Sequence, residues 1–103
     1  MTPEELQKAV STAGQGVVCA YFTAGWCRAC ASTAKVVERY NESSDLLLYT
    51  VDMDTSMELA DLYDVSRLPT FVFFKHGDVA GVQCGGGVDV VDGAFRKVLN
   101  LVD

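Results

Sequence analysis

The sequence predicts one α/β domain over residues 1–103, with a mixed sheet of about four strands flanked by helices on both faces. Apolar runs too short for helices alternate with stretches whose apolar residues recur at helical spacing. In the first half of the chain, the order strand, helix, strand predicts a crossover between two parallel strands. In the second half, two strand-like runs joined by a tight turn predict a hairpin that adds two more strands.

The first element is expected to be a helix. Thr2-Pro3-Glu4-Glu5 has the pattern of a capping box with proline at the first helical position. Apolar residues then recur at helical spacing, at Leu6, Ala9 and Val10. Gly14 and Gly16 are expected to end this helix.

A crossover unit is expected next. The apolar run Val17–Thr23 is rich in residues that favour strands and is predicted to be a buried strand. A helix is expected from Cys27 to about Asn41, and a second apolar strand at Leu46–Asp52. The helix has Ala34, Val37 and Asn41 on one side, with Val36 and Tyr40 adjacent.

The second half begins with a short helix. Thr55-Ser56-Met57-Glu58 has the pattern of another capping box, which predicts a helix through about Tyr63. Pro69 has no backbone N–H to donate to a central strand, so it is expected to precede one.

A hairpin and a last helix complete the prediction. Thr70–Lys75 is the expected strand, His76-Gly77 the turn and Asp78–Cys84 the returning strand. Gly85-Gly86-Gly87 then interrupts the chain. The apolar stripe of the C-terminal helix is expected at Phe95, Val98, Leu99 and Val102.

The charge balance excludes some partners. The chain has 14 acidic and 8 basic residues, a net charge of −6. Nucleic acids and anionic membranes would repel such a chain, so neither is expected as a partner. No apolar stretch reaches the roughly 18–20 residues that span a bilayer, and the acidic N-terminus does not have the pattern of a signal peptide. We therefore expect a cytoplasmic protein.

Cys27 and Cys30 are the strongest chemical signal. They lie three positions apart where a strand leads into a helix. Backbone N–H groups and the dipole at a helix N-terminus favour a thiolate and lower a cysteine pKa from about 8.5 to roughly 3.5–7.5. Cys27 is therefore the expected nucleophile and Cys30 the thiol that resolves a mixed disulfide. Metal ligation is the alternative, but a four-cysteine site needs a second close pair, and Cys19 and Cys84 are far apart in the sequence.

Four segments in a fixed order carry a resemblance to a known family. They are Trp26-Cys27-Arg28-Ala29-Cys30, Val51-Asp52-Met53-Asp54, Leu68-Pro69-Thr70-Phe71 and Phe74-Lys75-His76-Gly77-Asp78. Over nearly its whole length the chain resembles thioredoxin. The resemblance implies a thioredoxin fold in which Pro69 is cis and faces the cysteine pair. It also implies that substrate backbone pairs at Leu68 and that Trp26 offers an apolar contact surface.

The function that this resemblance implies is disulfide exchange with protein substrates, in electron transport and cell redox homeostasis. An external reductase or dithiol donor would recycle the pair, and no cofactor or metal is expected on the chain. A weakly catalytic or non-catalytic binding subunit of a larger assembly is the alternative. A third reading is an oxidant or isomerase, which Arg28 would suit.

The chain departs from the family pattern at three positions near the pair. Arg28 lies between the cysteines, where its charge is expected to favour the thiolate and raise the reduction potential above the roughly −270 mV of thioredoxin. The alternative is a solvated arginine whose charge is screened. The family's buried aspartate and its lysine partner fall at Tyr21 and Thr50. Tyr21 either fills the core or donates a hydrogen bond.

The family's first strand has no counterpart before the first helix. Four strands instead of five are therefore expected, with a sheet edge left to be blunted or to pair with another strand. We expect a monomer rather than a homodimer.

The remaining cysteines and the single histidine are expected to have lesser roles. Cys84 lies by resemblance beside Pro69, as a regulatory thiol or as a small packing residue. Cys19 is expected in the core. His76 is expected to be a solvated turn residue and not a catalytic base.

Overall fold

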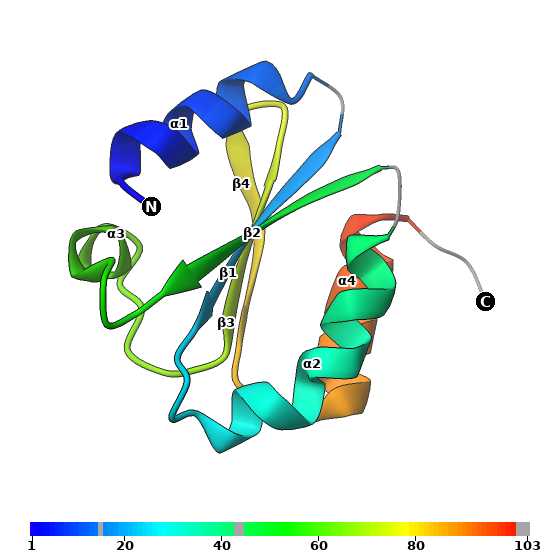
Figure 1. Ribbon diagram of the computed structural model, residues 1–103. Coiled ribbons are helices and arrows are strands. Elements are labelled where there is room, and N and C mark those ends of the chain that lie inside the picture. Colours follow the sequence, from blue (N-terminus) through cyan, green and yellow to red (C-terminus); the bar gives the residue numbers. More distant parts are fainter. Residues whose placement is uncertain (15, 43–44, 101–103) are drawn as a thin grey trace.

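A four-stranded sheet lies between two pairs of helices in the computed structural model, which describes residues 1–14, 16–42 and 45–100 (Figure 1). Residues of α1 and α3 pack on one face, and residues of α2 and α4 on the other. The predicted mixed sheet with helices on both faces is confirmed. The elements are α1 (Pro3–Thr12), β1 (Val17–Thr23), α2 (Arg28–Asn41), β2 (Leu46–Asp52), α3 (Met57–Leu62), β3 (Thr70–Lys75), β4 (Asp78–Cys84) and α4 (Val88–Val98).

The strand order β2-β1-β3-β4 and the strand directions bring the segments after β1, β2 and β4 and the segment before β3 to one end of the sheet. β1 runs parallel to β2, with Thr23 opposite Asp52, so both strands finish at that end. β3 is antiparallel to β1 and starts there, because Thr70 is opposite Phe22. β4 is antiparallel to β3 and returns to the same end, with Cys84 opposite Thr70. The segments after β1, after β2 and before β3 therefore meet.

The two predicted capping boxes had different outcomes. At α1 the box is confirmed, because the Glu5 N–H donates to Thr2 Oγ1 at 3.2 Å and the Thr2 N–H donates to Glu5 Oε1 at 2.9 Å. At α3 the prediction is wrong, since Ser56 is the N-cap and makes no side-chain capping bond. The N–H and the hydroxyl of Thr55 both donate to the Asp52 carbonyl, which keeps this residue in a turn.

An aromatic cluster fills the core beneath α2 and α4. Phe95 is fully buried and meets the rings of Phe71 and Phe73 edge-on, with centroid distances of 5.4 and 5.1 Å. The ring of Tyr40 stacks on Phe95, and its hydroxyl donates to Asp92. Burial, with this hydrogen bond, raises the pKa of Tyr40. These contacts join α2 and α4 to the sheet.

Some predicted helix positions differ from the structure. Asn41 is exposed, whereas Thr33 is buried because its hydroxyl donates to the carbonyl of Cys30 at 3.1 Å. In α4, Phe95 is buried and Val98 and Leu99 are half-buried. Val102 lies outside the described residues.

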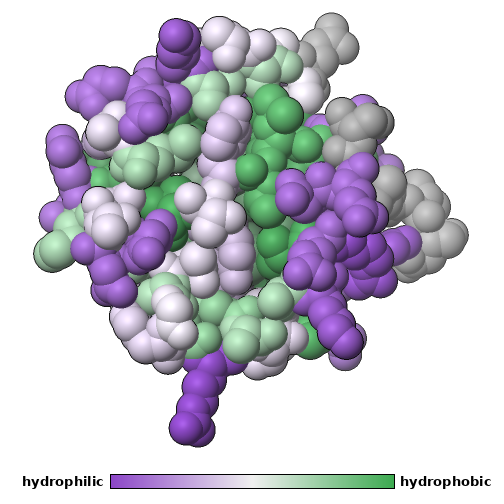
Figure 2. Space-filling view, viewed as in Figure 1, coloured by the Kyte–Doolittle hydropathy of each residue, from purple (hydrophilic) through white to green (hydrophobic). Residues whose placement is uncertain are grey.

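β2 forms one edge of the sheet, and its hydrogen bonds show which of its backbone groups face β1. The Asp45 carbonyl accepts from the Val17 N–H, and the Met53 N–H donates to the Thr23 carbonyl. Because strand residues alternate, the backbone groups of Leu46, Leu48 and Thr50 point away from β1. Viewed towards this edge, hydrophobic residues form a band down the middle of the molecule (Figure 2). The expected monomer stays a prediction.

Within the described ranges, none of the helices has the length and apolar character needed to cross a membrane.

Candidate functional site

The cysteine pair lies where β1 leads into α2, as expected. Cys27 is the N-cap of α2, and Cys27 and Cys30 form a disulfide with their Cα atoms 5.3 Å apart. The N–H of Cys30 donates to Cys27 Sγ at 3.1 Å. An N–H in the first turn of a helix has no partner within the helix, and this one points at the sulfur, so after reduction it would stabilise negative charge on Cys27.

Leu68 and Pro69 bring the segment before β3 against the pair. The buried side chains of Cys27 and Cys30 cluster with Ala24, and Leu68 packs against this cluster. The Leu68–Pro69 peptide bond is cis, as the resemblance implied. The Pro69 carbonyl accepts from the Gly85 N–H at 2.7 Å, which fixes the proline to the loop after β4. Within the described ranges, the N–H and C=O of Leu68 have no intramolecular hydrogen-bond partner.

Trp26, which directly precedes Cys27, has an exposed side chain. Its side chain is 68% exposed. The indole Nε1–H donates to Asp54 Oδ1 at 3.3 Å, and the Asp54 N–H donates to Asp52 Oδ1 at 2.8 Å. The segment after β2 therefore orients the tryptophan. An exposed ring held in this way offers an apolar surface to a bound chain.

Arg28 and Tyr21 occupy different environments. Arg28 is exposed at the first position of α2. Tyr21 is 8% exposed and stacks on Phe71 with centroids 4.9 Å apart, which agrees with the core-filling interpretation. Thr50, opposite Tyr21 on β2, is exposed.

The two cysteines outside the pair differ in accessibility. Cys84 is exposed, so its interpretation as a small packing residue is wrong. It ends β4 opposite Thr70, and the Thr70 hydroxyl lies 3.6 Å from its sulfur. Cys19 is fully buried in β1, and burial raises the pKa of its thiol, so it stays protonated and unreactive. His76 is exposed in the β3–β4 turn with φ of 53°, as expected of a turn residue.

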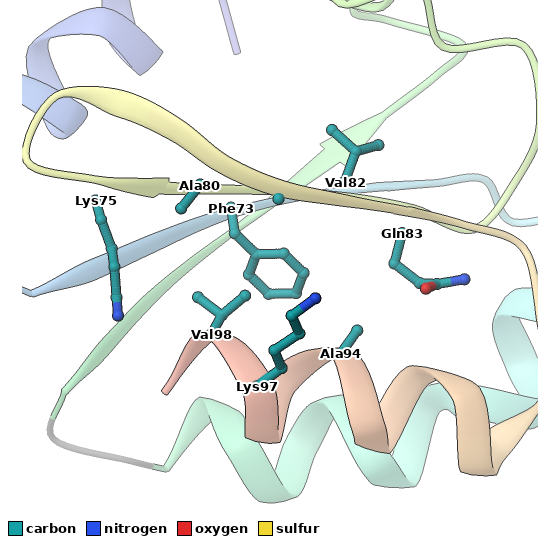
Figure 3. Close-up of a pocket in the computed structure, with 9 residues that line it drawn as sticks. Phe73, Lys75, Ala80, Val82, Gln83, Ala94, Lys97 and Val98 are labelled. Atoms are coloured by element: carbon teal, nitrogen blue, oxygen red, sulfur yellow. The ribbon is translucent and has the colours of Figure 1, made fainter. Parts of the chain in front are cut away.

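A separate cavity of about 350 Å³ lies between β4 and α4, away from the cysteine pair. Figure 3 shows the Phe73 ring and Lys97 facing each other across it. Among the described residues, no cysteine, histidine or carboxylate lines this cavity. Among the residues that the structure describes, no group of three or more His, Cys, Asp or Glu side chains is placed to hold a metal ion.

Three residues at the site were given no role from the sequence, although Met53 and Asp54 lie in one of the four segments that carry the resemblance. Met53 packs beside Leu68 on the cysteine cluster, and Asp54 holds Trp26. Arg67 precedes Leu68, and its carbonyl accepts from the Thr70 hydroxyl at 2.6 Å. The parallel pairing of β1 and β2 was a usable signal for Met53 and Asp54, because residues that follow parallel strands meet at one sheet end.

Comparisons with known proteins agree with this geometry. The family model described as Thioredoxin matches residues 1–92. A thioredoxin of Geodia cydonium is 38% identical over 77 residues, covering 74% of this chain and 73% of that protein. A probable protein disulfide-isomerase A6 of Medicago sativa is 34% identical over 96 residues, which cover 89% of this chain but 26% of that protein's length.

A solved structure shows the same fold. The X-ray structure of Fasciola hepatica thioredoxin superposes with a TM-score of 0.84 at 28% identity, covering 93% of each chain. The thioredoxin fold inferred from the sequence is therefore confirmed. On the family match, the aligned relatives and the close cysteine pair, this chain belongs to the thioredoxin family of thiol–disulfide oxidoreductases.

Proposed function

We propose that this chain reduces disulfides in protein substrates, with Cys27 as the nucleophile and Cys30 as the resolving thiol. The observation that carries the proposal is the hydrogen bond from the Cys30 N–H to Cys27 Sγ at the start of α2. A sulfur in this position is the one whose thiolate the helix N-terminus favours. Cys30 is more deeply buried, at 4% exposure against 9% for Cys27. This burial suits a thiol whose target is the mixed disulfide on Cys27 and not the substrate in solution.

The reaction has two exchange steps. The Cys27 thiolate attacks one sulfur of the substrate disulfide, and the other substrate sulfur leaves as a thiolate that takes a proton from solvent. Cys30 then loses its proton to solvent and attacks Cys27 Sγ, which forms the Cys27–Cys30 disulfide and releases the second substrate thiolate. Two electrons pass from the protein to the substrate. An external reductase or dithiol donor returns them.

The backbone at Leu68 supports a docking role for the segment before Pro69. Its N–H and C=O are without intramolecular partners in the described part of the chain, while its side chain contacts the cysteine cluster. An extended substrate segment would satisfy both groups next to the reacting sulfur. Trp26 would cover the opposite side of that segment.

A reducing compartment such as the cytoplasm suits this direction of electron flow. Glutathione and related systems there keep most thiols reduced, and the pair would be re-reduced after each turnover. Cys84, an exposed thiol with no disulfide, would also persist in such a compartment.

Insulin reduction driven by dithiothreitol tests the proposed direction. We expect the wild-type protein to accelerate precipitation of the insulin B chain, because the helix N-terminus favours the Cys27 thiolate, which is the attacking species. Cys27→Ser is expected to fall to the rate of dithiothreitol alone, and Cys84→Ser, which keeps the pair, is expected to retain wild-type activity. Equal rates for wild type and Cys27→Ser would reject the reductase and favour the binding subunit.

A further inference from the structure

Two arginines border the place where a substrate chain would lie. Arg28 directly follows Cys27, and Arg67 directly precedes Leu68, whose side chain packs against Cys27 and Cys30. Both arginines are exposed. In Figure 1 the segment before α2 and the segment before β3 lie at the same end of the sheet. Each arginine is thus the sequence neighbour of a residue that would contact the substrate.

Neither guanidinium is paired with a carboxylate in the part of the chain that the structure describes. In residues 1–14, 16–42 and 45–100, no ion pair or side-chain hydrogen bond of Arg28 or Arg67 occurs. The carboxylates of the same region are Asp54, which accepts from the Trp26 indole, and Asp52, which accepts from the Asp54 N–H. Two arginines that form no ion pair within the described residues therefore lie next to the reactive pair, in a chain whose net charge is −6.

The backbone that carries Arg67 is held in place. The Thr70 hydroxyl donates to the Arg67 carbonyl at 2.6 Å, and Pro69 is tied to Gly85. These bonds hold the Arg67 backbone beside Leu68, and its exposed side chain extends from that fixed point. A guanidinium there can form a two-bond contact with a carboxylate.

We propose that Arg28 and Arg67 make the enzyme select protein disulfides whose reactive cysteine is flanked by acidic residues. This proposal rests on the reductase function proposed above and leaves its exchange steps unchanged. Complementary charge increases the rate of association and fixes the register of the bound segment. The preference is therefore expected in the second-order rate constant and is expected to weaken as salt screens the charges.

Three disulfide-linked peptide dimers test the proposal. They differ only in the two residues that flank the cysteine, which are Glu, Gln or Lys. Pre-reduced protein is mixed with each peptide in a single turnover, and the released peptide thiol is measured after acid quenching. We expect the Glu peptide to react about tenfold faster than the Lys peptide at low ionic strength, with the Gln peptide between them. At about 0.5 M salt, roughly three times the physiological ionic strength, the ratio of the Glu-peptide rate to the Lys-peptide rate is expected to approach one.

Charge substitutions assign the preference to its residues. Arg67→Gln is expected to lower the Glu-to-Lys rate ratio several-fold, and Arg67→Glu to invert it. Lys8→Gln changes the net charge by the same amount as Arg67→Gln but lies on α1, remote from the segment before α2 (Figure 1), and is expected to keep the wild-type ratio. Because Arg67 is exposed, these variants are expected to fold, which circular dichroism checks.

The outcomes separate this proposal from the reductase function. Equal rates for the Glu and Lys peptides, with rapid reduction of the Gln peptide and insulin, would overturn the selection and leave the reductase intact. If Lys8→Gln changed the Glu-to-Lys rate ratio as much as Arg67→Gln, the assignment of the preference to Arg67 would be overturned. Failure to reduce any peptide or insulin would overturn both.

Discussion

A Cys30→Ser variant is expected to accumulate as a covalent adduct in which Cys27 is joined by a disulfide to a substrate cysteine. The first exchange step needs only Cys27, which lies at the start of α2 with Sγ facing the Cys30 N–H. The second step needs the Cys30 thiol, which the serine hydroxyl does not replace because it is far less acidic and does not form disulfides. Loss of turnover is expected to be essentially complete. Mass spectrometry of the variant after incubation with a disulfide peptide would show the added peptide mass.

The exposed thiol of Cys84 makes a control necessary. We expect the adduct to persist in Cys30→Ser/Cys84→Ser and to be absent from Cys27→Ser/Cys30→Ser. Cys19 is fully buried and does not interfere. An adduct that depends on Cys84 and not on Cys27 would contradict the assignment of the nucleophile.

Phe95→Ala is expected to cause the largest loss of stability among single core substitutions. The side chain is fully buried between Tyr40, Phe71 and Phe73, so its removal loses aromatic contacts on three sides and leaves a cavity. Such truncations cost about 3–5 kcal/mol, a large part of the roughly 5–15 kcal/mol by which a domain is stable. Urea unfolding of the oxidised protein, followed by far-ultraviolet circular dichroism, measures the change.

Val90→Ala on the same helix is the matched control. Val90 is 51% exposed, so its substitution is expected to change the unfolding free energy by less than about 0.5 kcal/mol. If Phe95→Ala cost no more than Val90→Ala, the aromatic cluster would not be the main contact that holds α4 to the sheet.

The strands and the buried faces of the helices were largely predictable, because the apolar patterns in the sequence agree with the burial in the folded protein. Val17–Thr23 and Thr70–Lys75 are continuous apolar runs, and both lie in the middle of the sheet, where both faces are covered. The first capping box formed with both of its reciprocal bonds, between Thr2 and Glu5. At Thr55 the same pattern failed, since the Asp52 carbonyl and the N-terminal ammonium group take the hydroxyls of Thr55 and Ser56.

The cysteine pair was predictable, but its surroundings were only partly so. Cys27 and Cys30 are close in sequence, and their position at a helix start follows from the neighbouring strand. The hydrogen bond from Trp26 to Asp54 joins segments 28 positions apart, and nothing local to either residue indicates it. Cys84 is exposed because β4 is an edge strand in which half-buried and exposed residues alternate towards its end. The sequence of β4 does not show that it lies at the edge.

Arg67 shows the same limit. Its own sequence neighbourhood marks it only as a polar residue before a proline. The structure adds that Leu68 rests on Cys27 and Cys30, which places the arginine beside the reactive pair. Residues that act through contacts across the fold are therefore the ones that sequence reasoning missed.

The redox equilibrium of the Cys27–Cys30 couple tests the central claim most directly. The protein would be equilibrated in glutathione buffers of defined ratio, and the reduced fraction would be measured by alkylation of the thiols and mass spectrometry, in a Cys84→Ser background. We expect one reversible two-electron transition with a midpoint above about −270 mV, because the Cys30 N–H and the Arg28 charge stabilise the reduced thiolate. A midpoint at or below that value would contradict the role given to Arg28. A pair that shows no reversible two-electron transition would contradict the claim that Cys27 and Cys30 exchange disulfides.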